Sequence, residues 1–381
     1  MRQAICHGVR HAPRHAAPRP EGLERPEGLR RLVGRGRLVG RGQARALALL
    51  PLAALLSPAC SLDYAQRCTE LAVTAGSRHE CEVPGWLDRA FSLEVPAAWD
   101  GGSSLPVLFV FHGGGGNRQS ANRVSCPDGD TAAPACLAAT ALARGYAVVT
   151  PDGTGGRPLR DVRTWNAGGG RALQCVSGPA CKSGVDDLRY FDDLLAQVAG
   201  TIPVDPRRVY ATGLSNGGAI SHRLACQRPE QLAAIAPVGG ANEWADDGGA
   251  CDLAGSAVAV RQLHGSADPC WPYDGGTQTC LQDDGRPKTS VATTMEGWRV
   301  RNRCSEAFTE RGAPVLVDDG TTLVIRTYTG CAATTELYTL QGGGHTWPSG
   351  WAYFGQARVG KVSHQTSNAE LLDFFDAHVR P

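Results

Sequence analysis

A serine lies between two glycines in the segment Gly213-Leu214-Ser215-Asn216-Gly217. The segment follows a strand-like run at 208–212 and precedes a helical stretch at 219–226. This G-x-S-x-G spacing is typical of a nucleophile, because small neighbours let the chain turn sharply from strand to helix and expose the serine hydroxyl. A glycine-rich turn without chemistry is the alternative, since so short a pattern also arises by chance.

Two later segments carry the partners that a nucleophilic serine needs. Asp268 ends the segment His264-Gly-Ser-Ala-Asp268, and His345 follows three glycines; each segment comes directly after a strand-like run. A carboxylate can orient an imidazole and stabilise its charged form while it takes the serine proton. Because the order Ser215, Asp268, His345 is that of the α/β-hydrolases, we predict these three as catalytic residues. His264 lies too close to Asp268 along the chain to be the base, so we assign it to holding the loop; a plain loop histidine is the alternative for His345.

A glycine loop supplies candidate donors for an oxyanion. The segment His112-Gly-Gly-Gly-Gly-Asn117 follows a strand-like run at 107–111. Acyl transfer develops a negative oxygen that needs preorganised N–H groups, and glycines allow backbone amides to approach it. We predict an oxyanion hole made by Gly113, Gly114 and Asn216. A phosphate-binding loop is the rival, but that pattern requires a lysine, which this segment lacks.

Tryptophans beside the motif loops are candidates for contacting a substrate. Aromatic walls suit a flat phenolic acyl group or a sugar ring. The alternative for each is packing in the core, to which we assign Trp298. The predicted substrate-binding residues are Trp165, Asn166, Trp271 and Trp347, with Trp351 as a further candidate.

These residues require a sheet whose strands end at one edge. Strand-like runs alternate with helical stretches, which indicates the α/β class: a mostly parallel central sheet with helices on both faces. Helices are predicted from an apolar stripe at 185–202 and from the capping box Ser367-Asn-Ala-Glu370. We expect a single catalytic domain over 68–381. The predicted strands are 91–95, 105–111, 146–150, 208–212, 258–263, 323–328 and 337–340.

The cysteines predict disulfides. Of fourteen cysteines, twelve remain when Cys6 and Cys60 near the N-terminus are set aside. An even set in an exported chain is typical of a disulfide framework. Zinc is the competing interpretation, but residues 68–381 have no C-x-x-C and no paired histidines at ligand spacing. The simplest pairing joins neighbours: Cys68–Cys81, Cys126–Cys136, Cys175–Cys181, Cys226–Cys251, Cys270–Cys280 and Cys304–Cys331.

The N-terminal region differs from the rest in charge. Residues 1–45 contain eleven Arg and three Glu, a net charge of +8, whereas 46–381 has a net charge of −7. We expect 1–45 to be a disordered leader, and an untranslated one if the true start lies near Leu38 or Val39. Residues 46–60 have the short apolar core and small residues of a secretory signal. Cys60 is a candidate for lipidation, with plain cleavage as the alternative. The total charge of +1 argues against a nucleic-acid binder.

The motifs together resemble those of the polyhydroxybutyrate depolymerase family, which includes feruloyl and acetylxylan esterases. The resemblance covers roughly 85–380 and implies an α/β-hydrolase fold and a secreted esterase with Ser215, Asp268 and His345 as its triad. It also supports two of the cysteine pairings, Cys226–Cys251 and Cys304–Cys331. The sequence departs from the pattern at two places, the four glycines at 113–116 and Gly169-Gly-Arg171. The matching segments are His112-Gly, Trp165-Asn-Ala-Gly168, Val185-Asp-Asp187, Val209 to Gly218, His264-Gly-Ser-Ala-Asp268-Pro and Gly342-Gly-Gly-His-Thr-Trp-Pro348.

The predicted function is therefore a serine carboxylic-ester hydrolase acting through an acyl-enzyme. Its expected substrates are feruloyl or acetyl esters of polysaccharides, or short hydroxyalkanoate esters. We expect no cofactor, no metal and no nucleic-acid partner, and a monomer that is secreted or anchored through a lipid at Cys60. A non-catalytic binding protein on a hydrolase scaffold and a serine peptidase of the same fold stay open as alternatives.

Overall fold

The computed structural model of the chain describes residues 67–86, 88–155, 162–168, 178–246, 251, 255–280 and 287–381. All of them belong to the unit Ser61–Pro381. The predicted leader, the signal segment, Cys60 and the segment Gly169-Gly-Arg171 lie outside the described residues. Among the helices of the described ranges, none has the length and apolar character needed to span a bilayer.

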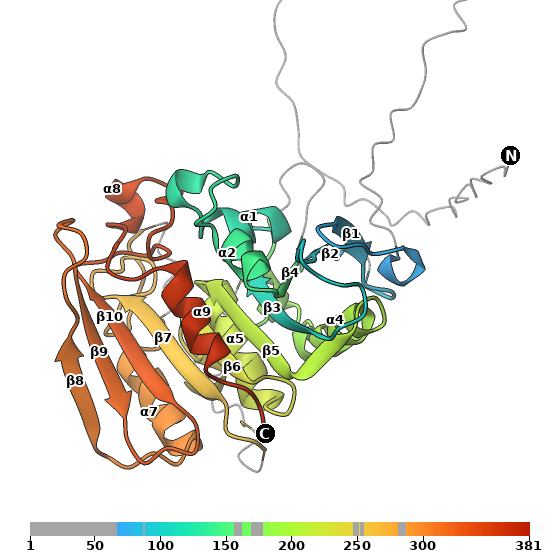
Figure 1. Ribbon diagram of the computed structural model, residues 1–381. Coiled ribbons are helices and arrows are strands. Elements are labelled where there is room, and N and C mark those ends of the chain that lie inside the picture. The colour runs from blue at the N-terminus through green and yellow to red at the C-terminus, as the bar shows by residue number, and fades with distance from the viewer. Residues whose placement is uncertain are drawn as a thin grey trace, which may run out of the picture. The chain divides into compact units, whose positions relative to one another are not determined.

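The described strands form one ten-stranded sheet in the order β1-β2-β4-β3-β5-β6-β7-β10-β9-β8 (Figure 1). From β4 to β10 neighbouring strands pair in parallel, whereas β1 and β2 at one edge and β8 and β9 at the other pair antiparallel. The strands are β1 Arg78–Glu82, β2 Ala90–Glu94, β3 Leu105–Phe111, β4 Ala147–Pro151, β5 Val204–Leu214, β6 Ala234–Val238, β7 Ala259–Gly265, β8 Phe308–Gly312, β9 Thr322–Tyr328 and β10 Thr335–Gln341.

The two faces of the sheet bury separate apolar clusters. Every residue of β3 is buried, and its side chains alternate between the clusters: Phe109 and Phe111 lie in one, Leu108 and Val110 in the other. This alternation follows from the two-residue period of a strand, and burial on both faces explains the continuous apolar run. The sheet therefore has the two-sided core of an α/β protein.

Helices cover both faces. Side chains of α4, α5 and α7 belong to one cluster or pack beside it, and those of α1, α2 and α9 belong to the other. The capping box that the sequence predicted at Ser367 starts α9, because the Ser367 side chain accepts from the Glu370 amide and the Glu370 side chain accepts in return. The helices are α1 Arg118–Arg123, α2 Leu137–Ala143, α3 Pro179–Lys182, α4 Asp187–Ala199, α5 Asn216–Gln227, α6 Glu243–Asp246, α7 Val291–Arg301, α8 Gln356–Val359 and α9 Asn368–Asp376, with short 3-10 turns at Cys68–Glu70 and Pro127–Gly129.

The predicted fold class is confirmed. Each of the seven predicted strands coincides with an observed strand, with ends shifted by a few residues. Three strands were missed: β1 and β8, because they are polar edge strands, and β6, because its sequence Ala-Ile-Ala-Pro-Val is poor in residues typical of strands.

Five of the six predicted disulfides are present and pair neighbouring cysteines. Cys181 is also disulfide-bonded, and its predicted partner Cys175 lies outside the described residues. The five bonds are Cys68–Cys81, Cys126–Cys136, Cys226–Cys251, Cys270–Cys280 and Cys304–Cys331.

Candidate active site

Ser215 occupies a sharp turn between β5 and α5. Its φ of +61° lies in the left-handed region that non-glycine residues rarely adopt, and its amide donates to the Val238 carbonyl at 2.8 Å. A Cβ atom on Gly217 would lie 2.2 Å from the Phe111 carbonyl oxygen, so only glycine fits there. The strained turn and the close approach of β3 explain the glycine and serine spacing that the sequence analysis singled out.

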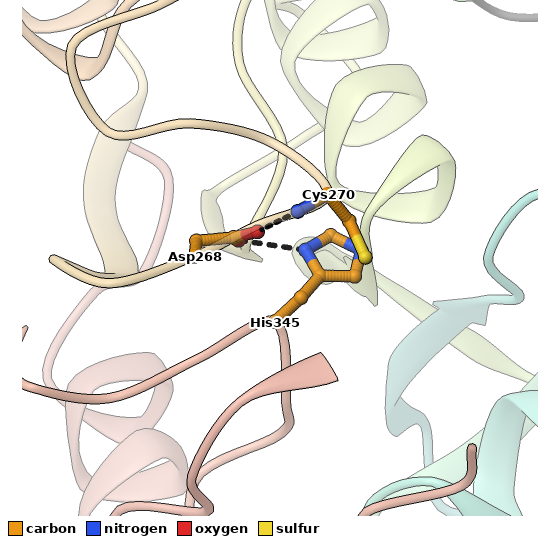
Figure 2. Close-up of side chains that lie close together, drawn as sticks. All are labelled: Asp268, Cys270 and His345. Atoms are coloured by element: carbon orange, nitrogen blue, oxygen red, sulfur yellow. Dashed lines mark hydrogen bonds and ion pairs between the residues drawn. The ribbon is translucent and has the colours of Figure 1, made fainter. Parts of the chain in front are cut away.

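Asp268 and His345 are joined by a short hydrogen bond (Figure 2). His345 Nδ1 lies 2.6 Å from Asp268 Oδ2, and both side chains are buried. The other carboxylate oxygen accepts from the backbone amides of Cys270 and Trp271, each at 2.7 Å. The carboxylate is thus held on both oxygens, and His345 is bound through one ring nitrogen while Nε2 is left for other chemistry.

The segment after β6 brings Ser215 and His345 to the same place. The position of a Cβ on Gly239 is 3.2 Å from His345 Nδ1, and that of a Cβ on Gly240 is 2.3 Å from the Ser215 carbonyl oxygen. Two adjacent residues therefore contact the serine turn and the imidazole. Because β5, β6, β7 and β10 are parallel neighbours, the loops that follow them meet at one edge of the sheet.

The environment of Asp268 favours its charged form. Burial raises the pKa of this carboxyl, but the neighbouring charge of His345 and the hydrogen bonds from His264 and His345 lower it by more. The pKa of Asp268 therefore lies well below its usual range. A permanently ionised carboxylate beside Nδ1 is what an imidazole needs to accept a proton at Nε2.

The glycine loop after β3 lies against the serine turn. A Cβ on Gly113 would be 3.6 Å from the Ser215 Cβ, and one on Gly114 would be 3.6 Å from the Asn216 Cβ. His112 fixes this loop, since its Nδ1 lies 2.8 Å from the Gly113 carbonyl and its Nε2 accepts from the Gly153 amide at 2.9 Å. The amides proposed as oxyanion donors thus come from two segments that touch beside Ser215.

Curated relatives of the chain are esterases. It is 27% identical over 267 residues to feruloyl esterase B of Piromyces equi, a match covering 68% of this chain and 42% of the relative. It is 27% identical over 213 residues to feruloyl esterase C of Emericella nidulans, covering 55% of this chain and 67% of the relative. The chain is therefore similar to feruloyl esterases. The resemblance read from the motifs is thereby confirmed, and the coarse activity that these relatives support is carboxylic ester hydrolysis.

A solved structure agrees on the fold. Acetyl xylan esterase from Aspergillus awamori superposes with a TM-score of 0.51 at 13% identity, covering 79% of this esterase and 99% of that chain. At this identity the likeness concerns the fold alone. No model of a protein family matches the chain.

The predicted aromatic substrate contacts lie in the interior of the esterase. Trp165, Trp271 and Trp347 are 1%, 3% and 1% exposed. Each indole N–H has an internal acceptor. Trp165 donates to the His112 carbonyl, Trp271 to the Thr289 carbonyl and Trp347 to the Asn368 side chain. The structure therefore favours the core-packing alternative over an open aromatic wall, because none of the three rings offers a free face to solvent.

Asn166 and Asn216 have structural partners that the sequence did not reveal. Asn216 pairs its side-chain amide with both backbone groups of Trp165, accepting at 2.7 Å and donating at 3.1 Å. The backbone amide of Asn166 donates to Asp187 Oδ2, and its side-chain amide donates to the Val185 carbonyl. The motifs Trp165-Asn-Ala-Gly168 and Val185-Asp-Asp187 thus lock each other and the first residue of α5. The sequence could not predict these hydrogen bonds, since the partners are far apart along the chain and meet only in the folded structure.

One group of side chains has the spacing of a metal site in the esterase. Ligand atoms of Asp268, Cys270 and His345 lie within 4.8 Å of one another (Figure 2). The Cys270 sulfur is bonded to Cys280, however, and the carboxylate already accepts three hydrogen bonds. These residues do not fit a metal, because a disulfide sulfur is not the thiolate that metals bind.

Proposed function

We propose that this esterase is a serine carboxylic-ester hydrolase in which Ser215, Asp268 and His345 form the catalytic triad. The observation that carries the proposal is the 2.6 Å bond between His345 Nδ1 and the buried Asp268, next to a serine in a strained, half-buried turn. With Nδ1 bound to the carboxylate, Nε2 is the nitrogen available to a hydroxyl.

The mechanism follows from these roles. His345 Nε2 removes the Ser215 proton as the hydroxyl oxygen attacks the ester carbonyl carbon. The carbonyl oxygen becomes negative and accepts hydrogen bonds from the amides of Gly114, with its neighbour Gly113, and of Asn216. The imidazolium then protonates the leaving alcohol. Water attacks the acyl-enzyme by the reverse route, with His345 again as base, and releases the acid.

The substrate class that we propose is an ester of a polysaccharide with a feruloyl or acetyl group. Feruloyl esterases among the relatives support this choice. Short hydroxyalkanoate esters are the second class, suggested by the motif resemblance. Five disulfides in the described residues support export to an oxidising compartment.

Replacement of the nucleophile tests the mechanism. Ser215→Ala is expected to lower turnover of methyl ferulate and p-nitrophenyl acetate by several orders of magnitude and to abolish labelling by a fluorophosphonate probe, with unchanged folding by circular dichroism. Ser305→Ala, an exposed serine, is the matched control. Hydrolysis by Ser215→Ala at the wild-type rate would refute the assignment.

A substrate panel separates the remaining classes. We expect hydrolysis of methyl ferulate, acetylated xylan or hydroxybutyrate oligomers and little hydrolysis of matched amides. Faster cleavage of peptides than of esters would instead indicate a peptidase. A protein that neither reacts with the probe nor turns over any ester would be a binding protein on a hydrolase scaffold.

A further inference from the structure

A line of buried polar side chains runs from α7 to the carboxylate of Asp268. The Trp298 indole on α7 donates to His222 Nδ1 on α5 at 2.9 Å, and His222 Nε2 lies 2.8 Å from Gln262 Oε1 on β7. Gln262 Nε2 lies 3.1 Å from His264 Nδ1 on the same strand. His264 Nε2 lies 2.8 Å from the Trp271 carbonyl and 3.4 Å from Asp268 Oδ2. We call these four side chains, Trp298, His222, Gln262 and His264, the relay.

The indole at the far end fixes the direction of every bond in the relay. An indole N–H can only donate, so His222 Nδ1 must accept and the proton of the neutral ring lies on Nε2. That N–H donates to Gln262 Oε1, which leaves the Gln262 amide nitrogen as a donor. Its two N–H groups are directed at His264 Nδ1 and at the Gly240 carbonyl, 2.9 Å away. His264 must then carry its proton on Nε2, facing Asp268.

Burial makes this direction hard to reverse. His222 and Gln262 are 0% exposed, and His264 and Trp298 are 1% exposed, so bulk water does not replace a missing partner. Burial lowers the pKa of His222 to about 4, although its hydrogen bond to Gln262 raises the pKa. His222 is therefore neutral at neutral pH, with one donor and one acceptor, as the sequence of bonds requires.

The relay contacts the candidate site at two places, Asp268 and the Gly240 carbonyl beside Ser215. The titratable groups that face His264 are Asp268, Tyr273 with ring centroids 5.9 Å apart, and His222 across Gln262. At its other N–H, Gln262 binds the carbonyl of Gly240, the residue that packs against the Ser215 backbone. A reversed relay would turn the bare Nε2 of His264 toward a carbonyl and a carboxylate, and three acceptors would face one another without a proton.

We propose that Trp298, His222 and Gln262 are positioning residues that lock His264 in its neutral, Nε2-protonated tautomer and so direct a permanent N–H at Asp268. The proposal rests on the proposed function, because it deepens the role of Asp268 as the orienter of His345. His264 is thus a fixed donor, to the Trp271 carbonyl at 2.8 Å and toward Asp268 Oδ2 at 3.4 Å, rather than a second base. Its N–H keeps one carboxylate oxygen placed for His345 while the two backbone amides hold the other.

Histidine tautomers in the full-length wild-type protein provide a direct test that does not depend on turnover. In nitrogen-15 spectra of the histidine-labelled chain at about pH 8, His264 is expected to show a protonated Nε2 and a bare Nδ1. A proton on Nδ1 of His264 at this pH would overturn the relay. Neither result bears on whether Ser215 is the nucleophile, so failure of the relay and failure of the proposed function are distinguishable.

Two variants test the relay in activity. Trp298→Phe removes the indole donor and Gln262→Glu removes the donor to His264, and each is expected to lower kcat about 5- to 10-fold with KM nearly unchanged. In both, the His264 signal is expected to lose the pure Nε2-protonated pattern. Trp99→Phe is the matched control, because it removes a buried indole bond to the Ser103 carbonyl outside the relay.

The outcomes separate a positioning role from a structural one. A fall in kcat shared equally by Trp99→Phe, or a normal His264 tautomer in both relay variants, would overturn the proposal. If Trp298→Phe fails to fold, Gln262→Glu and the wild-type spectrum still decide. Gln262→Asn is not expected to keep the wild-type tautomer of His264 or the wild-type kcat, because the shorter side chain cannot span His222 and His264.

Discussion

Asp268 is the residue on which the most interactions of the site converge. Its carboxylate accepts from two backbone amides and from His345, and the His264 ring lies beside it. Asp268→Asn keeps the shape but removes the charge that stabilises the His345 imidazolium. We expect kcat to fall by about 1,000- to 10,000-fold, measured with p-nitrophenyl acetate, since an amide also favours the wrong imidazole tautomer.

Asp205→Asn is the matched control for this substitution. Asp205 forms an ion pair with Arg208 at the start of β5, at the opposite end of that strand from Ser215. The activity of Asp205→Asn should stay within about 2-fold of the wild type, because surface ion pairs contribute little to stability. A loss of similar size in both variants would show that the Asp268 effect is not specific to the site.

The helices α7 and α5 differ in whether a glycine position can accept a side chain. Gly297 is exposed in the middle of α7, with no atom within 4 Å of an added Cβ, whereas a Cβ on Gly217 would meet the Phe111 carbonyl at 2.2 Å. Gly297→Ala is expected to raise the free energy of unfolding by about 0.5–1 kcal/mol, because alanine favours a helix. Urea unfolding followed by circular dichroism measures this.

Gly217→Ala is the opposite case. The added methyl must push α5 away from β3, so we expect lower stability together with a large loss of activity at Ser215. Equal stability of the Gly217→Ala variant and the wild type would contradict the close approach of these two elements.

The elements also show which features a sequence can predict. The strands that precede Ser215, Asp268 and His345 could be placed because apolar runs and glycine turns are local signals. The relay could not be predicted from the sequence, because His222 is 40 residues from Gln262 and 76 from Trp298 along the chain. Likewise Trp165, which a motif placed beside the site, is buried by packing between elements that no local pattern specifies.

At the scale of the whole molecule, the buried His222 links stability to pH. Its pKa is about 4 in the folded chain and about 6.5 when unfolded, so the unfolded state binds more protons between these values. The free energy of unfolding is therefore expected to fall as the pH drops from about 6.5 towards 4, by up to about 3 kcal/mol from this residue.

Urea unfolding at about pH 7 and about pH 5 checks this dependence. His222→Gln should reduce the difference in unfolding free energy between the two pH values, whereas His79→Gln, on the edge strand β1, should leave it unchanged. An identical pH difference in the wild type and His222→Gln would show that His222 does not contribute.

The disulfides have a consequence for how the chain matures. Each of the five bonds joins a cysteine to the next one along the chain, over separations of 10 to 27 residues. Among the cysteines from Cys68 onward, one that emerges first would therefore have its correct partner follow as the next cysteine in these five pairs. We therefore expect that oxidation in order of synthesis would yield the native pairs, with little need for a disulfide isomerase to correct crossed bonds.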